Sequence, residues 1–338
     1  MSPQPKAPGP GSAPAAQGAR PGLPVDFGKV GVLLGGRSSE RDISLRSGAA
    51  VLRALREAGV DAHAFDPAER TLAELESASF ARVFLILHGR YGEDGAMQGV
   101  LETLRVPYTG SGVLASAIAM DKVSAKRIWE SAGLPTPAWT CLARGEPVPP
   151  GLERLGRRLV VKPVREGSTF GVSKVDATDR AGLEAALAQA WTFDREALVE
   201  ECIEGRELTC AVLGEGAGAV ALPLVEIVAP GANYDYHNKY FSDDTKYLCP
   251  APLDAALARH VSELCLRAYR AIGARGWGRI DVMLRGAPAG EQPYLLELNT
   301  APGMTDHSLV PMAARAAGMD FGRLVLRILA DARLELAA

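Results

Sequence analysis

Two carboxylates and one amide near the end of the chain have the types and the spacing of a divalent-metal site. Asp281 lies in the run GWGRIDVML, and Glu297 and Asn299 lie in YLLELNT. Apolar residues alternate along both runs, which predicts two β-strands, and the Gly- and Pro-rich segment between them predicts a turn. A hairpin that closes symmetrically about Ala289 places Asp281 beside Glu297, on the face opposite the buried side chains.

This set of ligands favours a hard cation. Two neighbouring carboxylates repel each other unless a positive charge lies between them. Oxygen ligands suit Mg²⁺ or Mn²⁺, which take few protein oxygens and complete their coordination with water and substrate phosphate. The hairpin therefore predicts a site where two metal ions hold a nucleoside triphosphate. The alternative is a solvated strand face that carries polar residues without a ligand.

Lysines upstream are candidates for binding the phosphates. Only eight of the 37 basic residues are lysine, so a retained lysine indicates a position that favours a compact ammonium on a flexible stem. Three of them lie within motifs: Lys122, Lys162 and Lys239. Others show that retention alone does not identify a site: Lys6, Lys174 and Lys246.

A glycine-flanked hairpin and the strand after it complete the predicted nucleotide site. The hairpin tip at 166–171 offers backbone N–H groups and the hydroxyls of Ser168 and Thr169, which can close over phosphates. An ordinary turn has the same composition, so this motif alone is weak. Glu200 in the next strand and Glu207 after it offer acceptors for the amino group and ribose hydroxyls of a nucleotide.

The first third of the chain predicts a parallel sheet, because strands at 30–34, 62–65 and 83–87 are separated by helical sequence. Ligands of such sheets lie at the carboxyl ends of the strands, where Glu40 and His88 fall. The helix after the first strand ends near Gly59, and its expected apolar stripe is Leu45, Ala49, Leu52 and Leu55.

Composition limits the function. A chain of 338 residues can form two or three domains. Its net charge of −3 predicts that neither nucleic acid nor an anionic membrane is a partner. No apolar run reaches the length of a transmembrane helix and the start has no signal-peptide pattern, so we expect a cytoplasmic protein. The five cysteines form no CxxC pair, which predicts reduced thiols.

Two segments are expected outside the packed core. Residues 1–27 are rich in Pro, Ala and Gly and predict a disordered tail. Residues 230–250 are polar and aromatic, and their length predicts a lid over the site rather than a routine connection. A helix at 253–274 precedes the metal hairpin, and an amphipathic helix at 321–334 closes the chain.

Seven motifs occur along the chain in one order: LLGGRSSERDISL, LHGRYGEDG, PYTGSGVLASAIAMDK, VKPVREGSTFGVSKV, NKYFSDDT, GWGRIDVML and ELNTAPGMTDHSLVPMAA. On these motifs the chain resembles the D-alanine–D-alanine ligase family of the ATP-grasp superfamily from about Gly28 to Ala330. The resemblance implies an α/β (α+β) ATP-grasp fold. Its domains would be an N-terminal Rossmann-like parallel-sheet domain at 28–120, a central domain at 121–205 and a C-terminal domain at 206–338, with ATP between the last two.

The resemblance implies roles at the ATP site. Lys122 and Lys162 would bind the nucleotide phosphates, and Lys239 would reach the γ-phosphate from the lid. Ser168 and Thr169 would cover that phosphate. Two Mg²⁺ or Mn²⁺ ions would be held by Asp281, Glu297 and Asn299, with Glu297 bridging.

It also implies roles at the amino-acid site. Glu40 would bind the ammonium of the first D-alanine, and Ser308 with the Leu309 N–H would bind the carboxylate of the second. Arg279 and the Gly303 N–H would form an oxyanion hole. A hydrogen-bonded set would join the substrate site to both mobile loops: Glu40, Ser168 and Tyr240.

The implied activity is ATP-dependent ligation of two D-alanines through an acyl phosphate, for peptidoglycan synthesis, by a homodimer. Two alternatives stay open. An acceptor such as D-lactate or D-serine would preserve the chemistry, although Tyr240 argues against D-lactate because the hydroxy-acid relatives usually have His there. A nucleotide-binding regulator without turnover would lack a metal ligand or the oxyanion arginine, and this chain has all of them.

Overall fold

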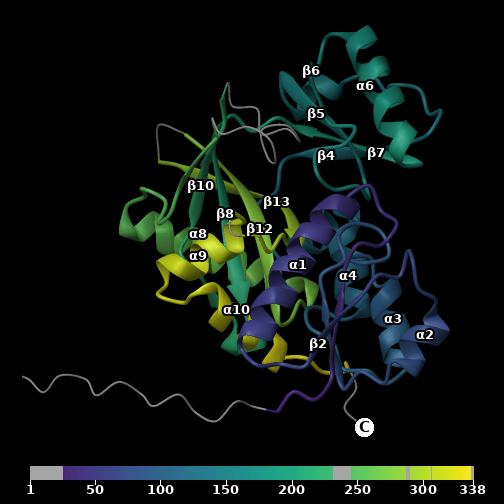
Figure 1. Ribbon diagram of the computed structural model, residues 1–338. Helices are drawn as coiled ribbons and strands as arrows, with labels where there is room; N and C mark the ends of the chain where they lie inside the picture. The colour runs from purple at the N-terminus through teal and green to yellow at the C-terminus, as the bar shows by residue number, and fades with distance from the viewer. Residues whose placement is uncertain (1–25, 231–244, 287–289, 306, 336–338) are drawn as a thin grey trace, which may run out of the picture.

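The computed structural model describes residues 26–230, 245–286, 290–305 and 307–335. Within them, three β-sheets follow one another along the chain. The first sheet has three strands, the second has four and the third has six. Figure 1 shows helices packed around these sheets, so the predicted mixed α/β class is confirmed. Most of the predicted tail lies outside the described residues, as do Lys239 and Tyr240 of the predicted lid.

The first sheet is parallel, as the alternating order of strands and helices predicts. Strand β1 (Val30–Leu33) lies between β2 (Ala62–Phe65) and β3 (Arg82–Leu85) and runs parallel to both. Helix α1 (Arg41–Glu57) connects β1 to β2, and α2 (Leu72–Ser77) connects β2 to β3. The residues directly before α1 and shortly after β3 therefore lie at the carboxyl edge of the sheet.

Helix α1 packs on the sheet through small residues as well as apolar ones. Leu55 is fully buried, but Ala49 is exposed, so the predicted apolar stripe is wrong at that position. Ser47 and Gly48 are buried instead. A Cβ atom added to Gly48 would lie 2.3 Å from the Cβ of Leu34. The helix thus approaches the end of β1 at a distance that only glycine allows.

The second sheet is antiparallel, with the order β4 (Trp139–Ala143), β7 (Glu196–Glu201), β5 (Arg158–Pro163) and β6 (Ser173–Asp176). Helix α6 (Arg180–Phe193) packs on this sheet and contributes to a separate apolar core. The helix begins after Asp179, which accepts the N–H of Gly182. The connection from β5 to β6 is the predicted glycine-flanked hairpin.

The third sheet contains the predicted metal hairpin. Its order is β11 (Lys246–Leu248), β10 (Val225–Val228), β8 (Gly205–Leu213), β12 (Trp277–Arg285) and β13 (Gln292–Asn299), and β9 (Val220–Ala221) pairs with β8. Helix α8 (Ala255–Ile272) packs against β8 and β13. Strand β12 pairs along its whole length with β8 and also with β13, so its side chains are held on a rigid support.

The remaining helices connect these sheets. Helix α5 (Lys122–Ser131) follows α3 (Ala96–Thr103) and α4 (Val113–Met120). Helix α9 (Leu309–Ala316) follows the third sheet, and α10 (Phe321–Ala330) ends before the predicted limit, because Arg333 instead forms a β-bridge with Tyr108. Short 3-10 turns lie at Leu152–Leu155 and Gly216–Gly218. Within the described residues, no helix combines the length and the apolar character that crossing a lipid bilayer requires.

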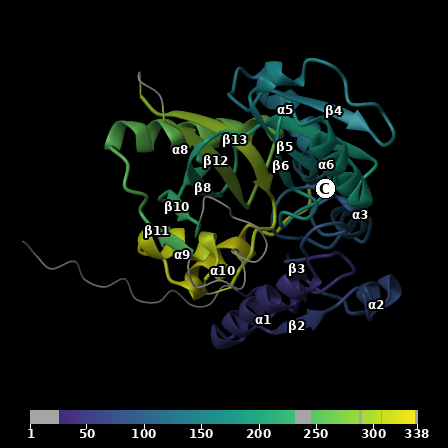
Figure 2. The same cartoon turned by 90° about the horizontal axis from the view of Figure 1, so that it is seen from above.

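One apolar core joins the first and third sheets. Helix α10 returns to pack against α1, and Figure 2 shows both C-terminal helices near the first sheet. Phe84 of β3 and Trp277 of β12 belong to this core, with ring centroids 6.3 Å apart. The three sheets fall within the segments 28–120, 121–205 and 206–338, except that β8 of the third sheet begins one residue earlier, at Gly205. The domain limits stay a prediction, because the first and last segments share a core.

Gly48→Ala should destabilise the protein, although alanine is the better helix former. The added methyl group would meet Leu34, and overpacking of this kind costs about 1–3 kcal/mol. Gly99→Ala in α3 is the matched control, because an added Cβ there has no neighbouring atom within 4 Å. It should be neutral or stabilising by up to ~1 kcal/mol. Urea denaturation measures both free energies of unfolding, and equal effects would contradict the close approach of α1.

Candidate active site

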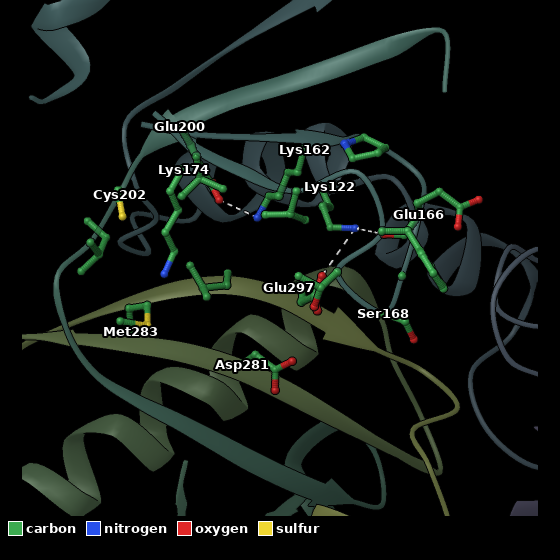
Figure 3. A pocket seen from close by; sticks show the side chains of 18 of the residues that line it. Lys122, Lys162, Glu166, Ser168, Lys174, Glu200, Cys202, Asp281, Met283 and Glu297 are labelled. Carbon is green, nitrogen blue, oxygen red and sulfur yellow. Dashed lines mark hydrogen bonds and ion pairs between the residues drawn. The ribbon is translucent and has the colours of Figure 1, made fainter. Parts of the chain in front are cut away.

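A cavity of about 480 Å³ lies between the second and third sheets. Cavities of this size hold small-molecule ligands and cofactors. Figure 3 shows Lys122 and Lys162 on one side of it, facing the strands that carry Asp281 and Glu297. The structure therefore brings together eight of the predicted site residues around one cavity: Lys122, Lys162, Ser168, Thr169, Glu200, Glu207, Asp281 and Glu297.

The register of the metal hairpin confirms the arrangement predicted from sequence. Asp281 on β12 pairs directly with Glu297 on β13, and Arg279 pairs with Asn299. A bulge follows Asp281, so the symmetric register ends there. Side chains at alternate positions share a face, so the two carboxylates, the amide and the guanidinium converge on one surface.

Asp281 is held by three protein donors. Arg279 donates from Nε to Oδ1 at 2.8 Å and from Nη2 to Oδ2 at 2.7 Å. The hydroxyl of Thr209 donates to Oδ1 at 2.7 Å, and Nδ2 of Asn299 donates to Oδ2 at 3.2 Å. Although Asp281 lies opposite the apolar face of β12, it is only 7% exposed. A buried carboxylate needs such donors, because desolvation otherwise disfavours its charge.

Lys122, at the first position of α5, connects the glycine-flanked hairpin to strand β13. Its Nζ donates to the backbone carbonyl of Glu166 at 2.6 Å and lies 3.5 Å from Oε2 of Glu297. Asp121, which directly precedes Lys122, accepts the N–H of Ser124 and so fixes the start of the helix. The ammonium of Lys122 is thus positioned where phosphate would meet the metal ligands.

Glu200 lies between two lysines and is nearly fully buried. Its Oε1 is 2.5 Å from Nζ of Lys162, and its Oε2 is 2.7 Å from Nζ of Lys126. Burial opposes the charge of Glu200, but the two lysines outweigh it and lower the pKa of this carboxyl. Burial also acts against the charge of Lys162, yet Glu200 and Glu297 raise its pKa. Lys162 therefore faces the cavity as a cation.

Lys126 is a site residue that the sequence motifs do not single out. It is 0% exposed, and its Nζ also donates to Oγ1 of Thr136 at 2.7 Å. Thr136 in turn donates to the carbonyl of Leu295 on β13 at 2.9 Å. This chain of contacts joins the second sheet to β13. The available signal is its spacing: Lys126 lies four residues after Lys122, on the same helix face. Lys174, whose retention is uninformative by itself, also lines the cavity.

The glycine-flanked hairpin docks onto the first sheet. Ser168 and Thr169 have φ angles of 49° and 65°, a strained conformation for residues with side chains. The hydroxyl of Ser168 donates to Oε1 of Glu40, which confirms one contact of the predicted Glu40, Ser168 and Tyr240 set. A Cβ on Gly167 would lie 2.7 Å from Oε2 of Glu40, so the backbone of the hairpin lies close to this carboxyl group.

A second, smaller cavity of about 30 Å³ adjoins the hairpin. Acidic side chains outnumber basic ones in its lining, which contains four glutamates and one lysine: Glu40, Glu93, Glu166, Glu297 and Lys122. Burial, and then the neighbouring charge of Glu40, raise the pKa of Glu93 to about 8. The cavity favours a positively charged group such as an ammonium. Glu93 is a further residue that the sequence motifs do not single out.

Gly303 and Ser308, predicted for the oxyanion hole and the carboxylate site, lie in the loop after β13, whereas the predicted oxyanion residue Arg279 lies on β12. Gly303 lies next to Ser308, because a Cβ on Gly303 would be 3.1 Å from Oγ of Ser308. That Oγ accepts the N–H of Thr305 at 2.9 Å, and Ser308 directly precedes helix α9, which begins at Leu309. A helix N-terminus favours an anion such as a carboxylate. His88 is 4% exposed and lines neither cavity, so its candidate role at the ligand is not supported.

The donor set at the hairpin fits a hard divalent cation. In the described part of the chain no three His, Cys, Asp or Glu side chains converge as metal ligands, so the set consists of two carboxylates and the amide of Asn299. A small set of oxygen donors such as this one suits Mg²⁺, because Mg²⁺ keeps water and phosphate oxygens as its other ligands. Arg279 and Lys122 lie beside the two carboxylates, which shows that this surface requires positive charge.

Lys126→Met should destabilise the protein by about 3–5 kcal/mol, because it breaks a buried ion pair and leaves part of Glu200 without its cation. Lys174→Met is the matched control: Lys174 also lies at the cavity but is exposed, so its loss should change stability by no more than ~0.5 kcal/mol. Chemical denaturation of both variants gives the comparison. Equal stabilities would show that the Lys126 pair is not structural.

Two family models match the chain. The model of the D-Ala–D-Ala ligase C-terminus covers residues 128–330, and that of the D-Ala–D-Ala ligase N-terminus covers residues 61–111. Among curated proteins, the chain is 57% identical over 315 residues to the D-alanine–D-alanine ligase of Ralstonia pickettii. The aligned region covers 93% of this chain and 94% of the relative. It is 56% identical over 312 residues to the ligase of Bordetella avium, spanning 92% and 97%.

Solved structures agree with these matches. The D-alanine–D-alanine ligase of Bacillus anthracis in complex with ATP superposes with a TM-score of 0.77 at 32% identity, covering 90% of this chain and 96% of that chain. A second structure of the Bacillus anthracis ligase gives a TM-score of 0.78 at 34% identity, with the same coverage. Because sequence and fold match over nearly the full length, the chain belongs to the D-alanine–D-alanine ligase family, whose fold is ATP-grasp.

Proposed function

We propose that this protein joins two D-alanine molecules, with ATP converted to ADP and phosphate, to give D-alanyl-D-alanine for peptidoglycan synthesis. One observation carries the proposal: the lysine-rich cavity and the acidic cavity are neighbours, and Lys122, Glu166 and Glu297 line both. A triphosphate in the first would therefore lie beside an ammonium-bearing substrate in the second. We also propose that the protein is a homodimer, as the resemblance implies, and that it is cytoplasmic.

The first half of the reaction would activate the carboxylate of the first D-alanine. A free carboxylate is a poor acyl donor because its leaving group would be oxide. Transfer of the γ-phosphoryl group from ATP makes an acyl phosphate and releases ADP, so phosphate becomes the leaving group. Glu40 would hold the substrate ammonium, while Lys122 and Lys162 bind the phosphates.

Asp281, Glu297 and Asn299 would hold the two metal ions, which supply positive charge to the transferring phosphoryl group when they are bound. Ser168 and Thr169 would cover the phosphates from the hairpin. The hairpin and the lid would also exclude water, since an exposed acyl phosphate would hydrolyse. The roles of Lys239 and Tyr240 stay predictions, because both lie outside the described residues.

The second half would form the peptide bond. Ser308 and the Leu309 N–H would bind the carboxylate of the second D-alanine, whose deprotonated amine attacks the acyl carbon. The tetrahedral intermediate carries a negative oxygen that Arg279 and the Gly303 N–H would stabilise. The intermediate then collapses with loss of phosphate. Because Arg279 already binds Asp281 at 2.7 Å, its guanidinium is positioned before substrate arrives.

The activity can be tested by measuring phosphate release from ATP and product formation with a panel of D- and L-amino acids and D-lactate. We expect phosphate release with D-alanine, accompanied by D-alanyl-D-alanine. Ester formation with D-lactate would instead support the hydroxy-acid ligase. ATP binding without phosphate release under any of these conditions would support the non-catalytic regulator.

Glu297→Gln should lower kcat by roughly 10³-fold or more, because it removes a charge at the site of phosphoryl transfer without changing side-chain size. Glu291→Gln on the same hairpin is the matched control, since Glu291 pairs with Arg206 at 3.5 Å and lines neither cavity. The two variants are compared by steady-state dipeptide formation at saturating Mg²⁺. Activity of Glu297→Gln within tenfold of the parent would defeat the metal assignment.

A further inference from the structure

We infer that Ser47 and Glu93, two residues of the N-terminal segment, position the loop that carries the Gly303 N–H and thereby control capture of the acyl phosphate by the second amino acid. The inference deepens the proposed function and rests on it. Both act through the backbone N–H groups that they bind and are positioning residues, and Glu93 also lines the acidic cavity. Two independent hydrogen bonds, one on each side of Gly303, support this role.

Ser47 holds the far side of the loop. It lies on α1, is 0% exposed, and its Oγ accepts the N–H of Met304 at 3.1 Å. The same Oγ lies 3.2 Å from Nε2 of His88. Burial lowers the pKa of His88 to about 4, so the imidazole is neutral near pH 7. The unprotonated Nε2 of a neutral imidazole can accept a hydrogen bond from the Ser47 hydroxyl. A lone pair of the Ser47 oxygen then remains to accept the N–H of Met304.

Glu93 holds the near side of the loop. Its Oε1 accepts the N–H of Ala301 at 3.1 Å, and its Oε2 accepts the N–H of Gly89 at 2.7 Å. The carboxyl group therefore ties the start of the loop to the backbone that follows β3. Each of its two oxygens accepts one of these N–H groups.

These two contacts fix the backbone immediately around Gly303. Ala301 and Met304 bracket that residue, and a Cβ on Gly303 would lie 4.0 Å from Oγ of Ser47. Backbone N–H groups in a buried site must find a partner, so loss of either acceptor would move the loop. Oxyanion donors act only within a narrow distance of the developing charge, and a displacement of about 1 Å can cost roughly 10²-fold in rate.

The two halves of the reaction separate this role from a general structural one. Phosphoryl transfer to the first D-alanine does not use the Gly303 N–H, whereas attack by the amine does. If the loop is displaced, the acyl phosphate still forms but is captured slowly, and water hydrolyses part of it to D-alanine and phosphate. Each ATP consumed then still yields one phosphate, but not one dipeptide.

The experiment compares Ser47→Ala and Glu93→Gln with the parent. Phosphate and D-alanyl-D-alanine are measured in the same reactions, together with KM for ATP. The matched control is Ser44→Ala, because Ser44 is also a buried serine of α1, and among the described residues its hydroxyl bonds within the N-terminal segment, to Gly35 and Ile86. Thermal melting of each variant checks folding.

We expect dipeptide formation in both variants to fall about tenfold to a hundredfold, with KM for ATP within about twofold of the parent. The ratio of dipeptide to phosphate should fall well below its value of about one in the parent, and Ser44→Ala should keep that ratio. If both variants lose rate but retain the parental ratio, or retain both, the positioning role is wrong. If the parent itself makes phosphate without dipeptide, the proposed function fails first. Glu93→Gln tests the inference separately if Ser47→Ala does not fold.

Discussion

The site depends on charge compensation between groups from distant parts of the chain. The paired carboxylates Asp281 and Glu297 would repel each other, and each has a cation beside it: Arg279 at 2.7 Å and Lys122 at 3.5 Å. Glu200 is compensated in the same way by Lys126 and Lys162. A buried charge without its partner is strongly destabilising. The second sheet, the metal hairpin and α5 are therefore held in one arrangement by the same ion pairs that form the site.

This arrangement also suits the exchange of ligands. The lysines that would bind phosphate already face carboxylates, and the carboxylates that would bind metal ions already face cations. Binding of ATP with its metal ions would replace one set of opposite charges with another, so no group has to be stripped of water without compensation. The hairpin adds the connection to the substrate, because Ser168 donates to Glu40 while the neighbouring Glu166 carbonyl accepts from Lys122.

The first sheet contributes more than an amino-acid pocket. It shares a core with the last segment of the chain, in which Phe84 lies against Trp277. Helix α1 packs closely on this sheet through Gly48 and presents Ser47 to the loop after β13. Because the shared core fixes α1 relative to that loop, hydrogen bonds between the two segments can hold backbone groups accurately. The loop around Gly303 is therefore held by residues from both the N-terminal and the C-terminal segments.

The sequence alone determined what depends on local periodicity. Alternation and a short turn placed Asp281 opposite Glu297, and the alternating order of strands and helices predicted the parallel first sheet. Only the tertiary structure decided which groups compensate one another. Ala301 and Glu93 are separated by 208 positions, and Met304 and Ser47 by 257, so no local pattern encodes their contacts. The same holds for the burial of Lys126 against Glu200 and the exposure of Ala49. Such contacts follow from the packing of sheets, where distance along the chain carries no information about distance in space.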